Sequence, residues 1–323
     1  MLREEKGRSG DFAAKLLAPS SEASTARKSA HSYPWRVAVQ SWEVASDLEP
    51  LDVRDLFRDE RAALVALLRD LGPEMWGAPT VCPRWDVHDI SLHLLDNDAG
   101  RLSSRRDGHS RGSNASFDYV AMAKAIDEEN EGWVRATRHL SPRLVTALLS
   151  FLGNELDEYL ADIDPWQEGV PVAWSGTGPT PNWLDIAREY TERWVHQQQI
   201  REAVGRPDLL ERRWLHPVLD TFMRSLPRAY DTEEAPLGTS VVVTILGSAG
   251  GRWAIVRDAA RWRLVASESV TPAAEVSLHE GIAWRLLSRM TSPGQAAGDI
   301  RLIGDRALGL PATRAVAVMN PGA

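Results

Sequence analysis

The sequence has a single cysteine, no long apolar run and no block of like charges. One thiol, Cys82, cannot form an intrachain disulfide, and such usage is typical of the reducing cytoplasm, where we expect the protein. No stretch approaches the ~20 apolar residues that a membrane-spanning helix needs. A formal net charge of −8 argues against nucleic-acid binding. We therefore expect small-molecule partners, with no nucleic acid and no membrane, and a monomer or homodimer.

A chain of 323 residues is long enough for two domains. Residues 1–48 lack the apolar core of a signal peptide and are predicted to be a disordered leader. Helical periodicity dominates 49–232, which predicts a helical bundle. Residues 237–318 contain short β-rich runs such as SVVVTIL and RWAIVRD, with one helix near 281–290, which predicts a small α+β domain. The fold class expected for the whole chain is α+β.

Six helices are predicted in the bundle from apolar periodicity and from cap and breaker residues. Asp86 is predicted to cap the second helix, with Asp89 at the third position of a capping box. Asn182 is predicted to cap the fifth helix, which ends at Gly205. The predicted helices are about 52–71, 87–101, 117–139, 142–161, 182–204 and 209–230.

Two of these helices carry polar stripes that include histidine. In the fifth helix, Glu192 and His196 stand four residues apart and therefore share one face. In the second helix, His93 lies on a stripe with Asp89 and Asn97, opposite an apolar face. Both stripes can be solvated surfaces, which is the usual case, but histidine is an uncommon residue on such faces. Two imidazoles and one carboxylate suit zinc with an open fourth position, or non-haem iron or nickel.

Two segments carry a family resemblance. The stretch LRDLGPEMWGAPTVCPRWDVHDISLHLLDNDAGRL resembles the opening signature of the mycothiol-dependent maleylpyruvate isomerase family, and ERWVHQQQIREAVGRP resembles its second signature. The resemblance implies a DinB-like four-helix bundle, followed by a C-terminal domain similar to sterol carrier proteins. The family's metal ligands fall on His93, Glu192 and His196. The chain departs from the family at Arg84, where glycine is usual, and at Asp86, where threonine is usual.

The resemblance also implies a function. In the family a divalent metal, zinc above all, binds the thiol of mycothiol, a cosubstrate of actinobacteria. The metal-bound thiolate then attacks a small electrophilic substrate, in a thiol-assisted isomerisation or a thiol transfer. Two alternatives stay open, because one fold supports many activities. They are a pathway-specific metalloenzyme that uses no thiol, and a non-catalytic DinB-like metal-binding protein.

Other residues were weighed for the same site. The family uses a C-terminal arginine, for which Arg289, Arg301 and Arg306 are all candidates. Cys82 has no patterned histidine partner, so a small buried residue is the favoured interpretation over a nucleophile. His88 lies about 140° around the helix from His93 and is not expected to bind the same metal. Three tryptophans are expected either to rim a pocket or to pack the bundle end: Trp166, Trp174 and Trp183. Arg193 and Arg201 are expected to be surface charges paired with neighbouring carboxylates, with contact to an acidic thiol conjugate as the alternative.

Overall fold

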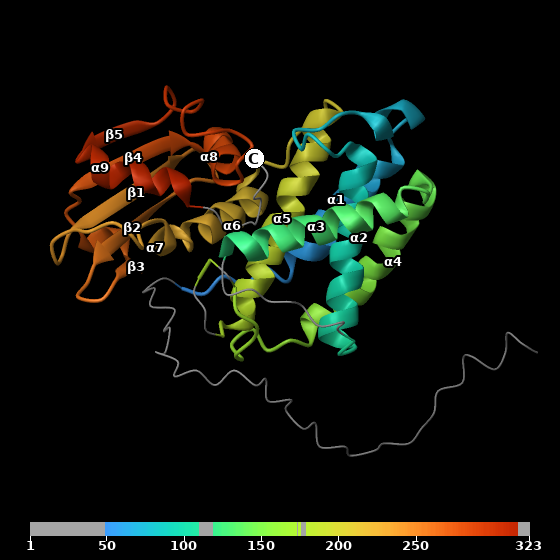
Figure 1. Cartoon of the computed structure of the whole chain (residues 1–323), viewed down its shortest axis with the longest axis horizontal. Helices are drawn as coiled ribbons and strands as arrows, with labels where there is room; N and C mark the ends of the chain where they lie inside the picture. Colours follow the sequence, from blue (N-terminus) through green and yellow to red (C-terminus); the bar gives the residue numbers. More distant parts are fainter. Residues whose placement is uncertain (1–48, 110–118, 173, 176–178, 316–323) are drawn as a thin grey trace, which may run out of the picture. The chain divides into compact units, whose positions relative to one another are not determined.

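The structure is a computed structural model that describes residues 49–109, 119–172, 174–175 and 179–315. The predicted leader, 1–48, lies outside the described residues. Every described residue belongs to one compact unit, Ser41–Ala323. Within it the helices come first and a five-stranded sheet follows (Figure 1), so the predicted α+β class is confirmed. The boundary between the two predicted domains stays a prediction.

All six predicted helices are present, but the last one is split. Residues 209–230 were predicted as one helix, whereas the chain breaks at Arg224 and Ser225. Pro227 explains the break, because it has no N–H with which to continue the hydrogen-bond ladder. The helices are α1 (Leu56–Arg69), α2 (Val87–Arg101), α3 (Tyr119–Thr137), α4 (Pro142–Ala161), α5 (Asn182–Ala203), α6 (Arg212–Met223) and α7 (Leu226–Ala229).

The cap of α2 is confirmed and the cap of α5 is wrong. The Asp86 carboxylate accepts a hydrogen bond from the Asp89 backbone N–H at 2.9 Å. Asp89 does not complete the capping box, because its carboxylate accepts instead from Arg138, at 2.8 and 2.9 Å. Asn182 is the first residue of α5, one position after the cap, and its side chain donates to the Asp164 carbonyl at 3.0 Å.

The sheet has the order β3-β2-β1-β4-β5. Strands β1 and β4 pair in parallel, and the other neighbouring pairs are antiparallel. The helix predicted near 281–290 is α8 (Glu280–Leu287), which ends early because Arg289 takes a left-handed conformation with φ of 61°. The strands are β1 (Ser240–Leu246), β2 (Gly251–Arg257), β3 (Trp262–Val265), β4 (Ala274–His279) and β5 (Arg301–Gly304).

The two faces of the sheet differ in what covers them. Alternate residues of a strand point to opposite faces. Val241, Val243 and Ile245 of β1 belong to a large apolar core that includes Phe222 of α6 and Trp284 of α8. Val242, between them, belongs to a small separate cluster. The large core extends into the helical part, where the Trp194 ring meets the Trp284 ring edge-on at 5.2 Å.

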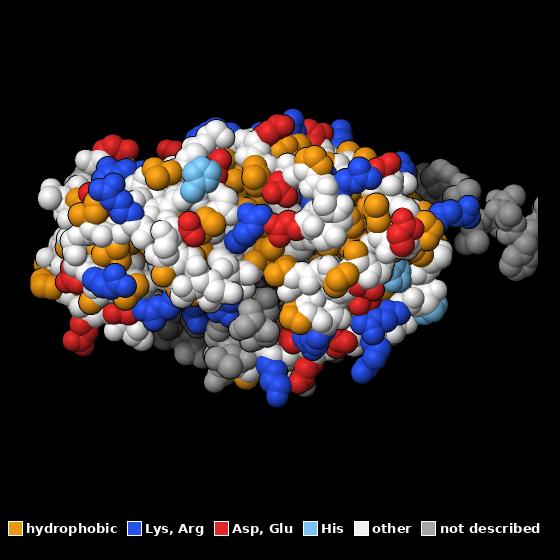
Figure 2. All heavy atoms as spheres, turned by 90° about the horizontal axis from the view of Figure 1, so that it is seen from above, with side chains coloured by type: hydrophobic (Ala, Val, Ile, Leu, Met, Phe, Trp, Pro, Cys, Tyr) orange, Lys and Arg blue, Asp and Glu red, His pale blue; other side chains and the backbone are white. Residues whose placement is uncertain are grey.

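The exposed side chains of one face mix the two signs of charge. On the face drawn in Figure 2, acidic and basic side chains of the described residues are interspersed, as opposed to gathered by sign. A search of the described residues found no helix with the length and apolar character needed to span a bilayer.

Candidate metal centre

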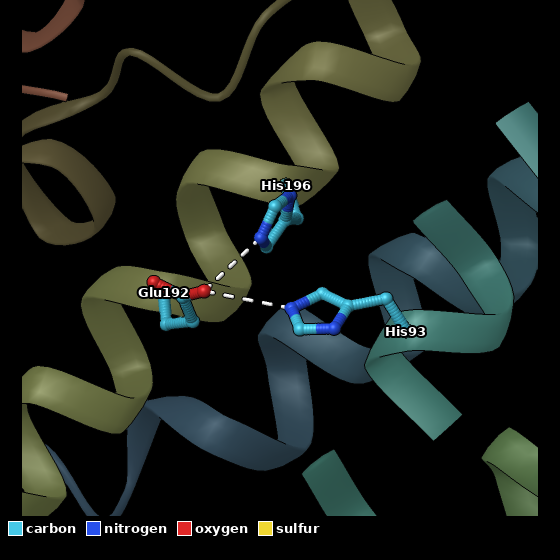
Figure 3. Close-up of side chains that lie close together, drawn as sticks. All are labelled: His93, Glu192 and His196. Atoms are coloured by element: carbon cyan, nitrogen blue, oxygen red, sulfur yellow. Dashed lines mark hydrogen bonds and ion pairs between the residues drawn. The ribbon is translucent and has the colours of Figure 1, made fainter. Parts of the chain in front are cut away.

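The structure brings together the three residues that sequence analysis selected. His93 lies in the middle of α2, and Glu192 and His196 lie one turn apart on α5 (Figure 3). Glu192 Oε1 is 3.1 Å from His196 Nε2 and 3.5 Å from His93 Nε2. The three donor atoms lie within 4.8 Å of one another. A carboxylate oxygen and two imidazole nitrogens therefore converge on one point.

Both polar stripes face the protein interior. His93 is 3% exposed and His196 is 9% exposed. The Trp85 indole packs against both imidazoles, with ring centroids 5.0 Å from His93 and 6.4 Å from His196. Solvated histidines, the alternative left open by the sequence, are excluded. The apolar residues on the opposite side of α2, such as Ile90 and Leu94, fix this orientation because they are fully buried.

The charges at the centre suit a divalent cation. Burial by itself would raise the pKa of Glu192, but hydrogen bonds from His196 and His93 outweigh it and hold the pKa well below its usual range. Burial lowers the pKa of His93, which favours the neutral imidazole. Glu192 is thus an anion whose hydrogen-bonding partners, among the described residues, are the two imidazoles. A carboxylate in this interior needs a positive partner, and a metal ion fits that need.

The outer contacts of the centre orient the imidazole of His196. Gln199 Oε1 lies 2.7 Å from His196 Nδ1, so Nδ1–H donates to the amide oxygen and Nε2 points at Glu192 Oε1. The same oxygen accepts from the Cys82 thiol at 3.4 Å. Burial, the largest cause, raises the pKa of Cys82 to about 11, so the thiol stays protonated as a donor. This favours the interpretation of Cys82 as a packing residue over a nucleophile.

A cavity of about 530 Å³ adjoins the centre. His93 and Glu192 both line it, whereas His196 lies behind them. Its other walls come from α2 and the turn after it, α3, α5, residues 170–172 and Trp174. This volume lies within the range of small-molecule sites. A metal at the centre would therefore have its open side toward a space that accepts a small ligand.

One wall of the cavity is an ion-pair network. Arg101 contacts Asp185 at 2.6 Å and Glu189 at 3.4 Å, and Arg188 contacts both carboxylates at 3.2 Å. Burial acts to raise the pKa of Asp185, but Arg101 and Arg188 lower it further, to about 2. The network extends from Glu189 to Arg193, and Arg193 forms an ion pair with Asp98. The expectation that Arg193 is a surface charge is wrong, because its side chain is 1% exposed.

Most of the other predicted site residues lie outside the cavity and away from the metal ligands. Trp174 lines the cavity, but Trp166 is 64% exposed and Trp183 packs under the guanidinium of Arg224 at 5.2 Å. His88 contacts the Leu140 carbonyl at 2.9 Å, away from the metal ligands as expected. Arg201 donates to the Pro207 carbonyl at 2.9 Å and not to a carboxylate.

No C-terminal arginine reaches the cavity among the residues that the structure describes. Arg289, Arg301 and Arg306 all have exposed side chains and none of them is a lining residue. The arginines that do line it come from α2 and the turn after it, and from α5. Sequence reasoning missed Arg101 and Arg188. Their helical spacing from His93 and Glu192 was visible, but an exposed arginine and a site arginine have the same spacing.

Comparison with known proteins supports the family resemblance. Residues 57–201 match the family described as "Mycothiol maleylpyruvate isomerase N-terminal domain". No curated protein matches the chain. Two solved structures are similar to it, the mycothiol-dependent maleylpyruvate isomerase and a histidine-to-alanine mutant of that enzyme. They are 13% and 12% identical, with TM-scores of 0.47 and 0.46, and each alignment covers 77% of this chain and 90% of the other.

Proposed function

We propose that this chain, whose residues 57–201 belong to the mycothiol maleylpyruvate isomerase N-terminal domain family, is a cytoplasmic metalloenzyme that uses a thiol. His93, Glu192 and His196 are the proposed ligands of one divalent ion, and zinc is the proposed ion because of the two-imidazole, one-carboxylate set. The observation that carries the proposal is the convergence of three donor atoms, from two buried histidines and a partly buried glutamate, beside a cavity that His93 and Glu192 line. The likeness of residues 237–318 to sterol carrier proteins stays a prediction, because the family match ends at residue 201.

A divalent ion at this position lowers the pKa of a thiol that binds to it. The protein's own residues hold the ion and shape the space beside it. Gln199 keeps the His196 lone pair directed at the centre, and Trp85 closes the side away from the cavity. The arginines of the network are held in place by Asp185 and Glu189, so this wall is rigid. The proposed reactions are a thiol-assisted isomerisation or a thiol transfer on a small electrophile.

The first test is elemental analysis of the purified protein. We expect about one divalent metal ion per chain, on the basis of a single three-ligand site. Protein that binds no metal even after reconstitution with zinc would refute the proposal.

The second test is a thermal-shift measurement with mycothiol on metal-loaded and metal-free protein. A ligand that binds the folded, loaded protein at a hundredfold excess over Kd adds about 2.7 kcal/mol of stability. We expect the shift in the loaded protein alone. An equal shift in both forms would mean that the thiol binds elsewhere. A loaded protein without any shift would favour a metalloenzyme that uses no thiol, or a non-catalytic metal-binding protein.

A further inference from the structure

Five carboxylates line the cavity, and most of them already have partners. Glu192 contacts the two imidazoles, and Asp185 and Glu189 are ion-paired with Arg101 and Arg188. A carboxylate held by arginine is a weak base, since the guanidinium stabilises its charged form. The two that are left are Asp96 of α2 and Glu129 of α3. Glu129 has an exposed side chain, whereas Asp96 is partly buried.

Asp96 differs from the other lining carboxylates in its surroundings. It follows His93 by three residues, so both side chains lie on the same side of α2. It forms no hydrogen bond or ion pair with any residue that the structure describes. Burial, followed by the nearby charge of Glu129, raises the pKa of Asp96 to about 6. A base is most effective when its pKa lies close to the working pH.

We propose that Asp96 is the catalytic base that takes the proton of the thiol entering the cavity. The inference rests on the proposed function, which requires a thiolate. In the step, the S–H bond of the thiol breaks, its electron pair stays on sulfur, and the proton moves to the Asp96 carboxylate. The sulfur lone pair then forms a C–S bond to the electrophilic carbon, while the π bond of an alkene substrate, or the bond to a leaving group, breaks and its electron pair moves away from that carbon. When that C–S bond breaks again, or when a leaving group departs, protonated Asp96 returns the proton to the thiolate or to the leaving group.

Other charged groups face the same space and do not compete for this role. From α5 these are Arg188 and the carboxylates of Asp185, Glu189 and Glu192, all of them in the contacts described above. From α2 and its following turn they are His93, Arg101 and Arg105. From α3 the facing group is Glu129, whose negative charge favours proton uptake by Asp96. Among the described lining residues, Asp96 is thus the partly buried carboxylate available as a base.

The test counts protons when mycothiol binds to the zinc-loaded protein. Isothermal titration calorimetry at pH 6.5, in buffers of different ionisation enthalpy, gives the number of protons passed to the buffer. In Asp96→Asn the thiol proton has no acceptor in the cavity, so about one proton should be released per mycothiol bound. The wild-type protein should release fewer protons, since the negative charge of the bound thiolate favours the protonated form of Asp96, which takes up part of the released proton.

Two further variants make the result decisive. Asp96→Glu restores a carboxylate and should behave like the wild type, even if Asp96→Asn folds poorly. Asp162→Asn changes an exposed aspartate outside the cavity and should also match the wild type. Equal proton release from wild type and Asp96→Asn would overturn the role of Asp96, while thiol binding itself would leave the proposed function intact. A zinc-loaded wild-type protein that binds no mycothiol would overturn the proposed function, and this inference with it.

Discussion

The helical part and the sheet part bury side chains of opposite character. Ionisable groups at most 9% exposed are frequent in the helices: Glu60, Arg61, Asp89, His93, Asp98, Asp185, Glu189, Arg193 and His196. Among the described residues from 240 onward, the buried charged side chain is Glu280, and its carboxylate accepts from the Ala249 backbone N–H at 2.7 Å. The sheet part is otherwise packed with aliphatic and aromatic side chains.

The two parts also differ in the space they enclose. The cavity between helices measures about 530 Å³, whereas the void between the sheet and its helices, lined by Val243 and Leu278 among others, measures about 10 Å³. A void of 10 Å³ is at the lower limit for one water molecule. The void lined by Val243 and Leu278 is therefore too small for a ligand.

The difference indicates where the chain carries its function. Burying charges costs free energy, and apolar residues of similar volume are often as stabilising or more so. A sequence selected for stability alone would have little use for so many buried ionisable groups, of which His93, Asp185 and Glu189 line the cavity. Their presence beside His93 and Glu192 supports a chemical role for the helices. The sheet part, by contrast, follows the ordinary rules of a packed apolar core.

The largest expected effect comes from breaking the buried ion pair of the helical part. Arg193 is 1% exposed and Asp98 is 0% exposed, so Arg193→Met leaves an uncompensated buried carboxylate. We expect the free energy of unfolding to fall by about 3–5 kcal/mol, measured by urea denaturation. The double variant Arg193→Met/Asp98→Leu should regain most of the loss. If the free energy of unfolding of the single variant falls by less than about 1 kcal/mol, the buried carboxylate of Asp98 does not depend on its arginine partner.

A cavity-forming substitution tests the sheet part, again through the free energy of unfolding. Ile255 of β2 is fully buried, and Ile255→Ala should cost about 2–5 kcal/mol of unfolding free energy through lost packing. Zinc affinity, measured by competition with a chelator, should not change in this variant. A weaker zinc affinity would show that the metal centre depends on packing in the sheet part. The helical part and the sheet part would then not be independent.

Loss of the charged ligand is expected to come next. Glu192→Gln replaces the carboxylate at the centre by a neutral amide, and zinc affinity should fall by more than about 100-fold, beyond the range of outer-contact changes. Glu189→Gln is the matched control, because Glu189 contacts Arg101, Arg188 and Arg193 and neither imidazole. Its zinc affinity should stay within about tenfold of the wild type. The reverse pattern would mean that the ligand assignment is wrong.

The outer contact of His196 ranks below the ligand itself. Gln199→Leu removes the acceptor of the His196 Nδ1–H, so the imidazole loses its fixed orientation. We expect zinc affinity to fall by about 10–100-fold. Gln199→Glu keeps an acceptor and should retain tight binding. Proton NMR of the zinc-loaded protein reads this contact directly: the Nδ1–H of His196 should exchange slowly with solvent in the wild type and faster in Gln199→Leu.

Much of the fold could be predicted from the sequence because its signals are local. Apolar periodicity, Asp86 as a cap and the β-rich run at 240–246 depend on neighbours in the chain. The i, i+4 spacing of Glu192 and His196 is local in the same way. Its pairing with His93 became persuasive through the family signatures. Spacing alone could not show that α2 and α5 turn these stripes toward each other.

The parts that could not be predicted depend on long-range contacts. From the sequence, Arg193 resembles a surface charge on a helix. Its ion pair with Asp98 joins residues 95 positions apart, so the sequence does not reveal it. Gln199 is one of three successive glutamines, and its contact with His196 depends on a side-chain rotamer. Asp96 carries no sequence signal at all. Its properties arise from burial and from the approach of Glu129 on α3.

The smallest expected effect concerns Asp96 and the pH dependence of stability. Its folded-state pKa, about 6, lies above the ordinary carboxyl value of 3.8, so the protonated form is favoured in the native protein. This contribution to stability is fully present below the ordinary value and is lost as the pH rises through about 6. Asp96→Asn cannot ionise and should escape that loss. We expect the variant and the wild type to have equal melting temperatures at pH 4. At pH 7.5 the metal-free variant should melt about 2 °C higher, a small shift because Asp96 is partly solvated. Asp162→Asn should show no such divergence between the two pH values. A variant that is less stable at pH 7.5 would mean that the Asp96 carboxylate has a stabilising partner, and it would exclude Asp96 as a base held ready in the cavity.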